Sequence, residues 1–174
     1  MEQVILVDAQ DTAHGVMEKM EAHQKAVLHR AFSVFIFNEK GDMLLQQRAM
    51  NKYHSGGLWT NSCCSHPRPG EETAAAAVRR LQEEMGFQTS LEKVFDFIYK
   101  AEFENGLTEY EFDHVFVGYY DGEVCPDPKE VNSFVYRPME EIVSLIQDQP
   151  QIFTAWFHIA FPKIYDWWLQ QKTS

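Results

Sequence analysis

Two glutamates and three histidines have the side-chain chemistry of a metal site. Glu109 and Glu111 stand two apart in a segment with strand composition, and period-two geometry aims both carboxylates at one face. Such a pair is more often a solvated strand face than a site. Together with His23, His29 and His66, the two acids would form a nitrogen and oxygen shell that Zn²⁺, Mn²⁺ or Fe²⁺ accepts. Spacing alone leaves both interpretations open.

The spacing of the histidines does not itself bring them together. His23 and His29 are six apart, which separates their side chains on a helix but returns them to one side of an extended chain. We expect the other histidines to be ordinary surface or hydrogen-bonded core residues. They are His14, His54, His114 and His158.

One cysteine has neighbours that could make it reactive. Cys64 lies between Ser62 and His66 in a segment without helical period, and a nearby histidine or metal ion would favour its thiolate. A small buried residue is an equally good interpretation of Cys64. For Cys63 and Cys125 we keep only that second interpretation.

Several cations could bind an anionic group. Arg80 and Glu84 share one face of a predicted helix, which is typical of a surface salt bridge worth about 0.3–0.5 kcal/mol. The alternative is that the acid holds Mg²⁺ and the arginine holds a phosphate, since Mg²⁺ prefers a few carboxylates together with substrate oxygens. Lys19, Arg48 and Lys52 could likewise bind a diphosphate, although each alone would be a solvated charge.

Two aromatic residues are open to either interpretation. Trp156 could belong to the core or could face a cation, and Tyr99 could belong to the core or donate a proton.

Length and composition limit the classes of protein. A chain of 174 residues with 45% hydrophobic content is sufficient for one domain with a continuous core. The net charge of -11 would repel a phosphate backbone, so we expect no nucleic-acid partner. Neither a membrane span nor a signal peptide is evident, which predicts a cytoplasmic protein without a membrane partner. We expect free thiols, because the three cysteines do not form an even disulfide framework. The sequence does not determine the oligomeric state, for which we expect a monomer.

Hydrophobic periodicity predicts the elements that must position these residues. Strands are expected where apolar residues alternate or run together between turn residues. They cover 3–8, 30–38, 42–49 as the hairpin partner of the preceding strand, a brief strand around LWTNS within the loop 52–71, 94–103 and 108–122. An Asn-Gly pair should join the last two as a hairpin.

Three helices complete the prediction. The segment from Glu71 to Met85 has apolar residues three or four apart and ends at Gly86, a natural stop. Further helices are expected over 138–149 and 154–171, where Pro162 should kink or interrupt the second. This order predicts an α+β protein, an α/β/α sandwich with a mixed sheet between helices.

The segment SHPRPGEETAAAAVRRLQEEMGF resembles a degenerate Nudix box, the diphosphate-binding loop and helix of Nudix hydrolases. The matching positions are Glu71, Arg79, Leu81, Glu83, Glu84, Gly86 and Phe87. Ser65 replaces the first glycine of that pattern, and Arg80 replaces a glutamate that helps the hydrolases hold metal. This replacement counts against nucleotide hydrolysis.

Nearly the whole chain resembles the type I isopentenyl diphosphate isomerases. The landmarks occur in order: EKMEAH, HRAFSVFIFN, LLQQRA, GLWTNSCCSHP, RRLQEEMG and EYE. The resemblance implies one Nudix-like isomerase domain over 1–174, with a Nudix-type core over about 28–162. It also implies a metal-dependent enzyme that interconverts isopentenyl and dimethylallyl diphosphates.

The same resemblance assigns roles to the candidate residues. It implies that Mn²⁺ or Zn²⁺ binds to His23, His29, His66, Glu109 and Glu111. It makes Cys64 and Glu111 the opposed proton-transfer groups, with Tyr99 beside Glu111. Glu84 and the Cys64 backbone carbonyl would hold a Mg²⁺ that bridges to the substrate diphosphate. The reaction would pass through a carbocation, and we assign Trp156 to the cavity wall that would stabilise it. The residues assigned to bind the substrate diphosphate are Lys19, Arg48, Lys52 and Arg80.

Two other functions remain as alternatives. A Nudix hydrolase acting on a nucleoside diphosphate derivative would release phosphate products. A catalytically inert metal-binding or regulatory Nudix-like domain would give no reason for Cys64 to stand beside His66 or for the two strand acids.

Overall fold

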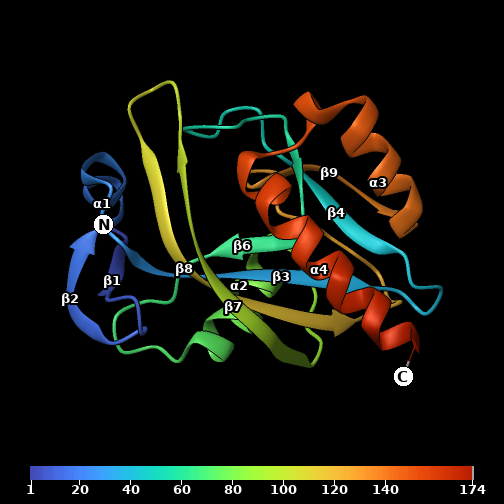
Figure 1. The fold of residues 1–174 in the computed structure, drawn as a ribbon, viewed down its shortest axis with the longest axis horizontal. Helices are drawn as coiled ribbons and strands as arrows, with labels where there is room; N and C mark the ends of the chain where they lie inside the picture. The colour runs from blue at the N-terminus through green and yellow to red at the C-terminus, as the bar shows by residue number, and fades with distance from the viewer. Residues whose placement is uncertain (174) are drawn as a thin grey trace.

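A mixed β-sheet forms the centre of the computed structural model, which describes residues 1–173 (Figure 1). Within those residues the sheet has nine strands. Their bounds are β1 (Gln3–Val7), β2 (Ala13–Glu18), β3 (His29–Phe37), β4 (Met43–Arg48), β5 (Trp59–Thr60), β6 (Cys63–Ser65), β7 (Leu91–Glu102), β8 (Thr108–Tyr119) and β9 (Val131–Arg137).

β3 lies in the middle of the sheet and contacts most of the strands that carry candidate residues. It pairs in parallel with β8, from His29 opposite Glu111 to Phe37 opposite Tyr119. On its other side it pairs antiparallel with β6, which places Ser33 opposite Cys64. These two pairings bring β6 and β8, which are distant in the sequence, to either side of β3 at one end of the sheet.

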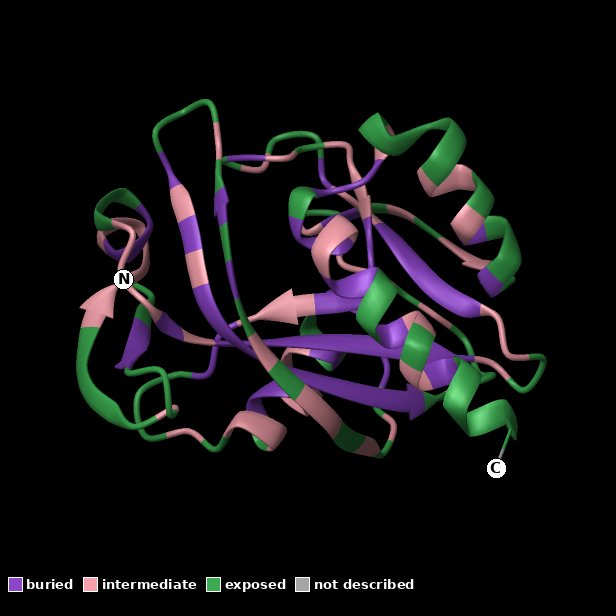
Figure 2. Cartoon of the chain, in the orientation of Figure 1, coloured by how far each residue is buried: buried purple, intermediate pink, exposed green. Residues whose placement is uncertain are grey.

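Helices cover both faces of this sheet. Their bounds are α1 (Lys19–Lys25), α2 (Thr73–Met85), α3 (Met139–Asp148) and α4 (Ala155–Thr173), with a 3₁₀ turn at Pro150–Ile152. Along β3, Val34 and Ile36 pack with α2, whereas Phe35 and Phe37 pack with α3 and α4. The buried residues concentrate on β3, β4 and β8, between these layers (Figure 2). The predicted α/β/α sandwich is confirmed.

The helix α2 forms as predicted and stops for a steric reason. Gly86 has a φ of 77°, in the left-handed region, and its N–H bonds to the Gln82 carbonyl. A Cβ at this position would lie 2.1 Å from the Cys125 carbonyl oxygen, so only glycine fits. Gly86 therefore ends α2 at a fixed position in the sequence.

Some predictions about single elements were wrong. β4 meets β3 at only one pair, Phe37 with Met43, and instead pairs along its length with β9, which we did not predict. α4 continues through Pro162, so of the expected kink or interruption the interruption is absent, and side chains packed on either side of Pro162 hold the helix against the sheet. The short elements α1, β2 and β6 also went unpredicted. No helix in residues 1–173 has the length and apolar character needed to cross a membrane.

Candidate active site and metal centre

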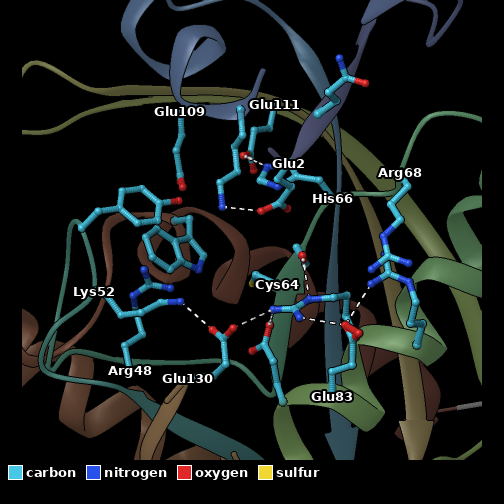
Figure 3. A pocket seen from close by; sticks show the side chains of 18 of the residues that line it. Glu2, Arg48, Lys52, Cys64, His66, Arg68, Glu83, Glu109, Glu111 and Glu130 are labelled. Carbon is cyan, nitrogen blue, oxygen red and sulfur yellow. Dashed lines mark hydrogen bonds and ion pairs between the residues drawn. The ribbon is translucent and has the colours of Figure 1, made fainter. Parts of the chain in front are cut away.

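A cavity of about 590 Å³ opens at the end of the sheet where β4, β6, β7, β8 and α2 converge (Figure 3). Most of the candidate residues line it. Those that do are Lys19, Arg48, Lys52, Cys64, His66, Arg80, Glu84, Tyr99, Glu109, Glu111 and Trp156. His23 and His29 are fully buried behind this lining.

Four side chains form a cluster that we call the histidine cluster: His23, His29, His66 and Glu111. One possible ligand atom from each lies within 4.8 Å of the others. Glu111 Oε2 is 2.8 Å from His66 Nε2, 3.2 Å from His29 Nε2 and 4.0 Å from His23 Nε2. Both ring nitrogens of His23 are buried without a hydrogen-bond partner in the described residues. Three imidazoles and one carboxylate form a ligand set that fits a divalent metal ion, and the His23 ring nitrogens are available to bind it.

A left-handed residue brings His23 and His29 together. His23 lies on α1, and Ala26 ends that helix with a φ of 54° before the chain enters β3 at His29. The two histidines therefore belong to different elements, so neither the helical nor the extended expectation for their spacing applies. His29 Nδ1 lies 2.8 Å from the Val27 carbonyl, which can only accept, so this nitrogen donates and leaves Nε2 as the metal-ligating nitrogen.

Glu109 lies outside the histidine cluster but is linked to it. The Tyr99 hydroxyl is 2.5 Å from Glu111 Oε1 and 3.0 Å from Glu109 Oε1, so the two strand acids do share a face. The other Glu109 oxygen, Oε2, lies 3.4 Å from His54 Nε2. Glu109 is thus held by two side chains and is not one of the four grouped ligands, and its role as a fifth ligand stays a prediction.

Burial and the histidines oppose each other at Glu111. Burial would raise the pKa of this carboxyl, but His66 and the other two histidines together hold it well below its usual range. In return, Glu111 raises the pKa of His29 in spite of burial. At His66 burial dominates and lowers the pKa. These shifts favour the ionised form of Glu111 and the neutral form of His66, the forms in which each can act as a ligand.

Cys64 faces the cavity, and Cys63 faces away from it. Cys64 packs with Tyr99 and Trp156, whereas Cys63 is fully buried in the core beneath α2. The expected loop is here the short strand β6, whose alternation separates the two thiols. The two adjacent thiols therefore point to opposite faces of β6, and only Cys64 lines the cavity.

The surroundings of Cys64 favour its protonated form. Its sulfur donates to Asn61 Oδ1 at 3.1 Å and lies 3.5 Å from the Ser33 hydroxyl, which in turn donates to Asp113. Burial raises the pKa of the Cys64 thiol. The thiolate that a nearby histidine would favour is therefore not the form favoured in this structure, because burial and the negative charge of Asp113 both raise the pKa of the thiol.

At the opposite end of the cavity, two cations and two acids form what we call the arginine cluster: Lys52, Arg80, Glu84 and Glu130. Arg80 Nη2 lies 2.7 Å from Glu84 Oε2 and 3.5 Å from Glu130 Oε1. Lys52 Nζ lies 2.6 Å from Glu130 Oε2 (Figure 3). Glu130 precedes β9 and was not predicted as a site residue. Each predicted diphosphate-binding cation of this cluster is therefore already paired.

Glu84 is more than a surface partner of Arg80. It is buried, and its Oε1 accepts from Gln46 Nε2 at 3.0 Å. Burial raises the pKa of this carboxyl in spite of Arg80. An exposed salt bridge is therefore the wrong description, and a buried carboxylate at the cavity suits a Mg²⁺ ligand.

The remaining candidates lie around the mouth and wall of the cavity. Lys19 pairs with Glu2 at 2.8 Å and lies over the Tyr53 ring. The Arg48 guanidinium lies 5.0 Å from the centre of the Trp156 ring, in a cation–π contact. Trp156 can therefore accept a cation on its π face, as its predicted role requires.

Known proteins are similar to this chain over most of its length. Residues 27–157 match the NUDIX domain family. An isopentenyl-diphosphate Delta-isomerase of Pectobacterium atrosepticum is 51% identical over 172 residues, covering 99% of this chain and 96% of the relative. One from Burkholderia multivorans is 48% identical, covering 95% and 97%.

Solved structures share the fold at low sequence identity. A Deinococcus radiodurans protein superposes with a TM-score of 0.71 at 18% identity, covering 85% of this chain and 90% of its own. A MutT protein from Methanosarcina mazei gives 0.66 at 19%, covering 84% and 96%. The fold, the matched domain and the full-length relatives lead to one conclusion: this chain belongs to the Nudix family and, within it, to the isopentenyl-diphosphate Delta-isomerases.

Proposed function

We propose that this protein interconverts isopentenyl and dimethylallyl diphosphates in isoprenoid biosynthesis, with Cys64 and Glu111 as its proton-transfer groups. The observation that carries the residue assignment is that one thiol and one carboxylate, from strands on either side of β3, line the same cavity. The relatives of this chain at 48–51% identity bear the name of that reaction.

The reaction needs two groups that differ by one proton. A proton is added to the terminal carbon of the alkene, positive charge falls on the tertiary carbon, and a second proton leaves the neighbouring carbon. The protein offers Cys64 as a thiol, with its pKa raised by burial, and Glu111 as a carboxylate, with its pKa lowered by three histidines. One group can therefore give a proton while the other receives one, and a proton must return from the second group to the first before the next turnover.

We assign a divalent ion, Mn²⁺ or Zn²⁺, to the histidine cluster, with Glu109 as a further ligand. Bound there, such an ion supplies positive charge that holds the Glu111 carboxylate in its ionised form. The single Tyr99 hydroxyl hydrogen lies between the two acids, 2.5 Å from Glu111 Oε1 and 3.0 Å from Glu109 Oε1 as measured from the hydroxyl oxygen, so Tyr99 would orient the Glu111 carboxylate. The unpartnered nitrogens of His23 support this assignment.

The substrate diphosphate belongs, in this proposal, at the arginine cluster. Lys52 and Arg80 would exchange their acidic partners for phosphate oxygens, with Lys19 and Arg48 completing the set of cations. Glu84, with the Cys64 backbone carbonyl, would hold Mg²⁺, which lowers the repulsion between the diphosphate and the acids nearby. The hydrocarbon part then reaches the wall formed by Trp156, where a desolvated cation gains about 2 kcal/mol.

Turnover followed by ¹H NMR tests the proposal. Isopentenyl diphosphate is supplied with Mg²⁺ and either Mn²⁺ or Zn²⁺, without flavin or nicotinamide. We expect the signals of both isomers to appear and reach a constant ratio, with no release of phosphate. An inactive, folded, metal-loaded protein would refute the proposal, and phosphate release would point to a hydrolase. The cytoplasmic location and monomeric state stay predictions.

A further inference from the structure

His54, which the sequence suggested was an ordinary histidine, lies where the wall of the cavity meets its acids. It follows β4, in the loop before β5, and only 8% of its surface is exposed. Its ring stacks on Phe103, with centres 4.3 Å apart and planes at 12°, and meets Trp156 edge to face at 5.7 Å. One imidazole therefore joins the β7 strand end to the first turn of α4.

The ring nitrogens of His54 have different partners. Nδ1 lies 3.0 Å from the Ser55 hydroxyl, and Nε2 lies 3.4 Å from Glu109 Oε2. Nε2 is buried and has no hydrogen-bond partner within the described residues, so its contact with Glu109 is electrostatic and not a hydrogen bond. Because a carboxylate only accepts, we assign the ring hydrogen to Nε2, which faces Glu109 Oε2, with the Ser55 hydroxyl donating to Nδ1.

The loop that holds His54 is constrained on several sides. Ser55 has a φ of 57°, a left-handed conformation that costs a non-glycine residue roughly 1 kcal/mol. Arg48 Nη2 donates to the His54 carbonyl at 3.2 Å, and Asn105 donates to the Tyr53 carbonyl at 3.0 Å. Such a conformation persists only where the surrounding contacts impose it, and these contacts hold the ring in one place.

We propose that His54 is a positioning residue that fixes the Glu109 carboxylate through Nε2 and holds the Trp156 indole against the cavity. Glu109 then has both oxygens held, one by Tyr99 and one by His54, and its carboxylate is fixed relative to Glu111. The inference rests on the proposed function, since the aligned groups are those of the isomerisation. His54 would thus act on the site through Glu109 and Trp156, without itself contacting the substrate or the metal ion.

Three substitutions separate the contact of His54 with Glu109 from its packing role. His54→Phe keeps an aromatic ring between Phe103 and Trp156 but removes both nitrogens. His54→Gln places an amide N–H where Nε2 lies, and His54→Asn is too short to do so. His14→Phe, at an exposed position on β2, is the matched control.

Loss of a side chain that orients a metal ligand typically costs about 10- to 100-fold in activity or metal affinity. We therefore expect His54→Phe and His54→Asn to lower kcat and the affinity for Mn²⁺ or Zn²⁺ by about that factor, with little change in KM. His54→Gln should recover most of both losses, and the Tm of all four variants should stay near that of the unmodified protein.

The inference is overturned if His54→Phe retains full kcat and metal affinity. It is also overturned if His54→Gln is as impaired as His54→Phe, or if Tm and kcat fall together in all three, because packing alone would then explain the losses. An unmodified protein that binds metal but does not isomerise the substrate would instead overturn the proposed function, and the metal affinities would still test the role of His54.

Discussion

The two ends of the cavity differ in whether their charged and polar groups are already paired. In the histidine cluster one carboxylate contacts three imidazoles, and both ring nitrogens of His23 are buried with no hydrogen-bond partner among residues 1–173. In the arginine cluster each cation has an acidic partner, at 2.6 Å for Lys52 and 2.7 Å for Arg80. The first end gains contacts by binding a cation, whereas the second must exchange existing contacts. We therefore expect changes at the histidine cluster to stop turnover and changes at the arginine cluster to weaken substrate binding.

The largest effect should come from Glu111→Gln. This change removes a proton-transfer group and the negative charge on which the histidine cluster depends, so we expect kcat to fall by at least about 10³-fold together with loss of tight metal binding. Turnover by NMR and metal content after dialysis measure the two losses, with exposed Glu92→Gln on β7 as the control. A variant within tenfold of the unmodified protein would show that Glu111 moves no proton.

Acid should weaken metal binding at the histidine cluster. Glu111 raises the pKa of His29, so His29 gains a proton, and stops being a ligand, at a higher pH than an ordinary histidine. Metal affinity should therefore be complete above this raised pKa and fall by about tenfold per pH unit below it for each competing proton. Titrations with Mn²⁺ or Zn²⁺ between about pH 5 and about pH 8 measure this slope. A flat profile would contradict a ligand role for His29.

The arginine cluster should respond in KM. Arg80→Met removes charge-assisted hydrogen bonds to the diphosphate, worth about 1.5–3 kcal/mol, so we expect KM to rise by about 10- to 100-fold while kcat changes less. Arg137→Met breaks an exposed ion pair with Glu141 and serves as the control. If kcat falls and KM stays constant, Arg80 acts on the reacting carbons or their neighbours, and the division between the two clusters fails.

The smallest effect concerns an ion pair at the start of α2 that should support only the fold. Arg79 donates to both oxygens of Glu71 at 2.8 Å, and these bonds lower the pKa of Glu71 to about 2. Glu71→Gln should cost about 1 kcal/mol of the free energy of unfolding at neutral pH. Because the folded pKa is lowered, that contribution is complete above the ordinary pKa of 4.5 and is lost as pH falls toward about 2.

Urea denaturation at neutral pH and at about pH 3 measures this difference, with exposed Glu141→Gln as the matched control. A stability difference that grows as pH falls would contradict the assignment, as would a large loss of kcat in folded Glu71→Gln protein.

Local pattern was sufficient for the long elements but not for the short ones. The three- and four-residue spacing in α2 and the alternation in β8 predict both elements correctly, because each pattern is set within the element. The strand β6 has only three residues, and β9 depends on β4 for its pairing, so neither has a period of its own. The hairpin expected between β3 and β4 failed for the same reason.

The convergence of the site depends on contacts between distant parts of the chain. His23 meets His29 through the left-handed Ala26, and Glu111 meets both through the parallel pairing of β8 with β3. Neither feature has a sequence signal apart from the family resemblance. His54 and Glu130 were missed for a related reason. The Ser-Gly-Gly that follows His54 signals a tight loop, but nothing local shows that this loop turns toward Glu109.

The adjacent cysteines allow the most direct test of the central claim, that the cavity at the end of β3 performs the isomerisation. Cys63→Ala and Cys64→Ala change the same atoms one residue apart, but only Cys64 faces Tyr99 and Trp156. Turnover of isopentenyl diphosphate is measured for both variants at equal metal loading, with folding checked by Tm and with Cys125→Ala as a further control. We predict that Cys64→Ala is inactive and that Cys63→Ala and Cys125→Ala keep most of their activity. An active Cys64→Ala beside an inactive, folded Cys63→Ala would contradict the account.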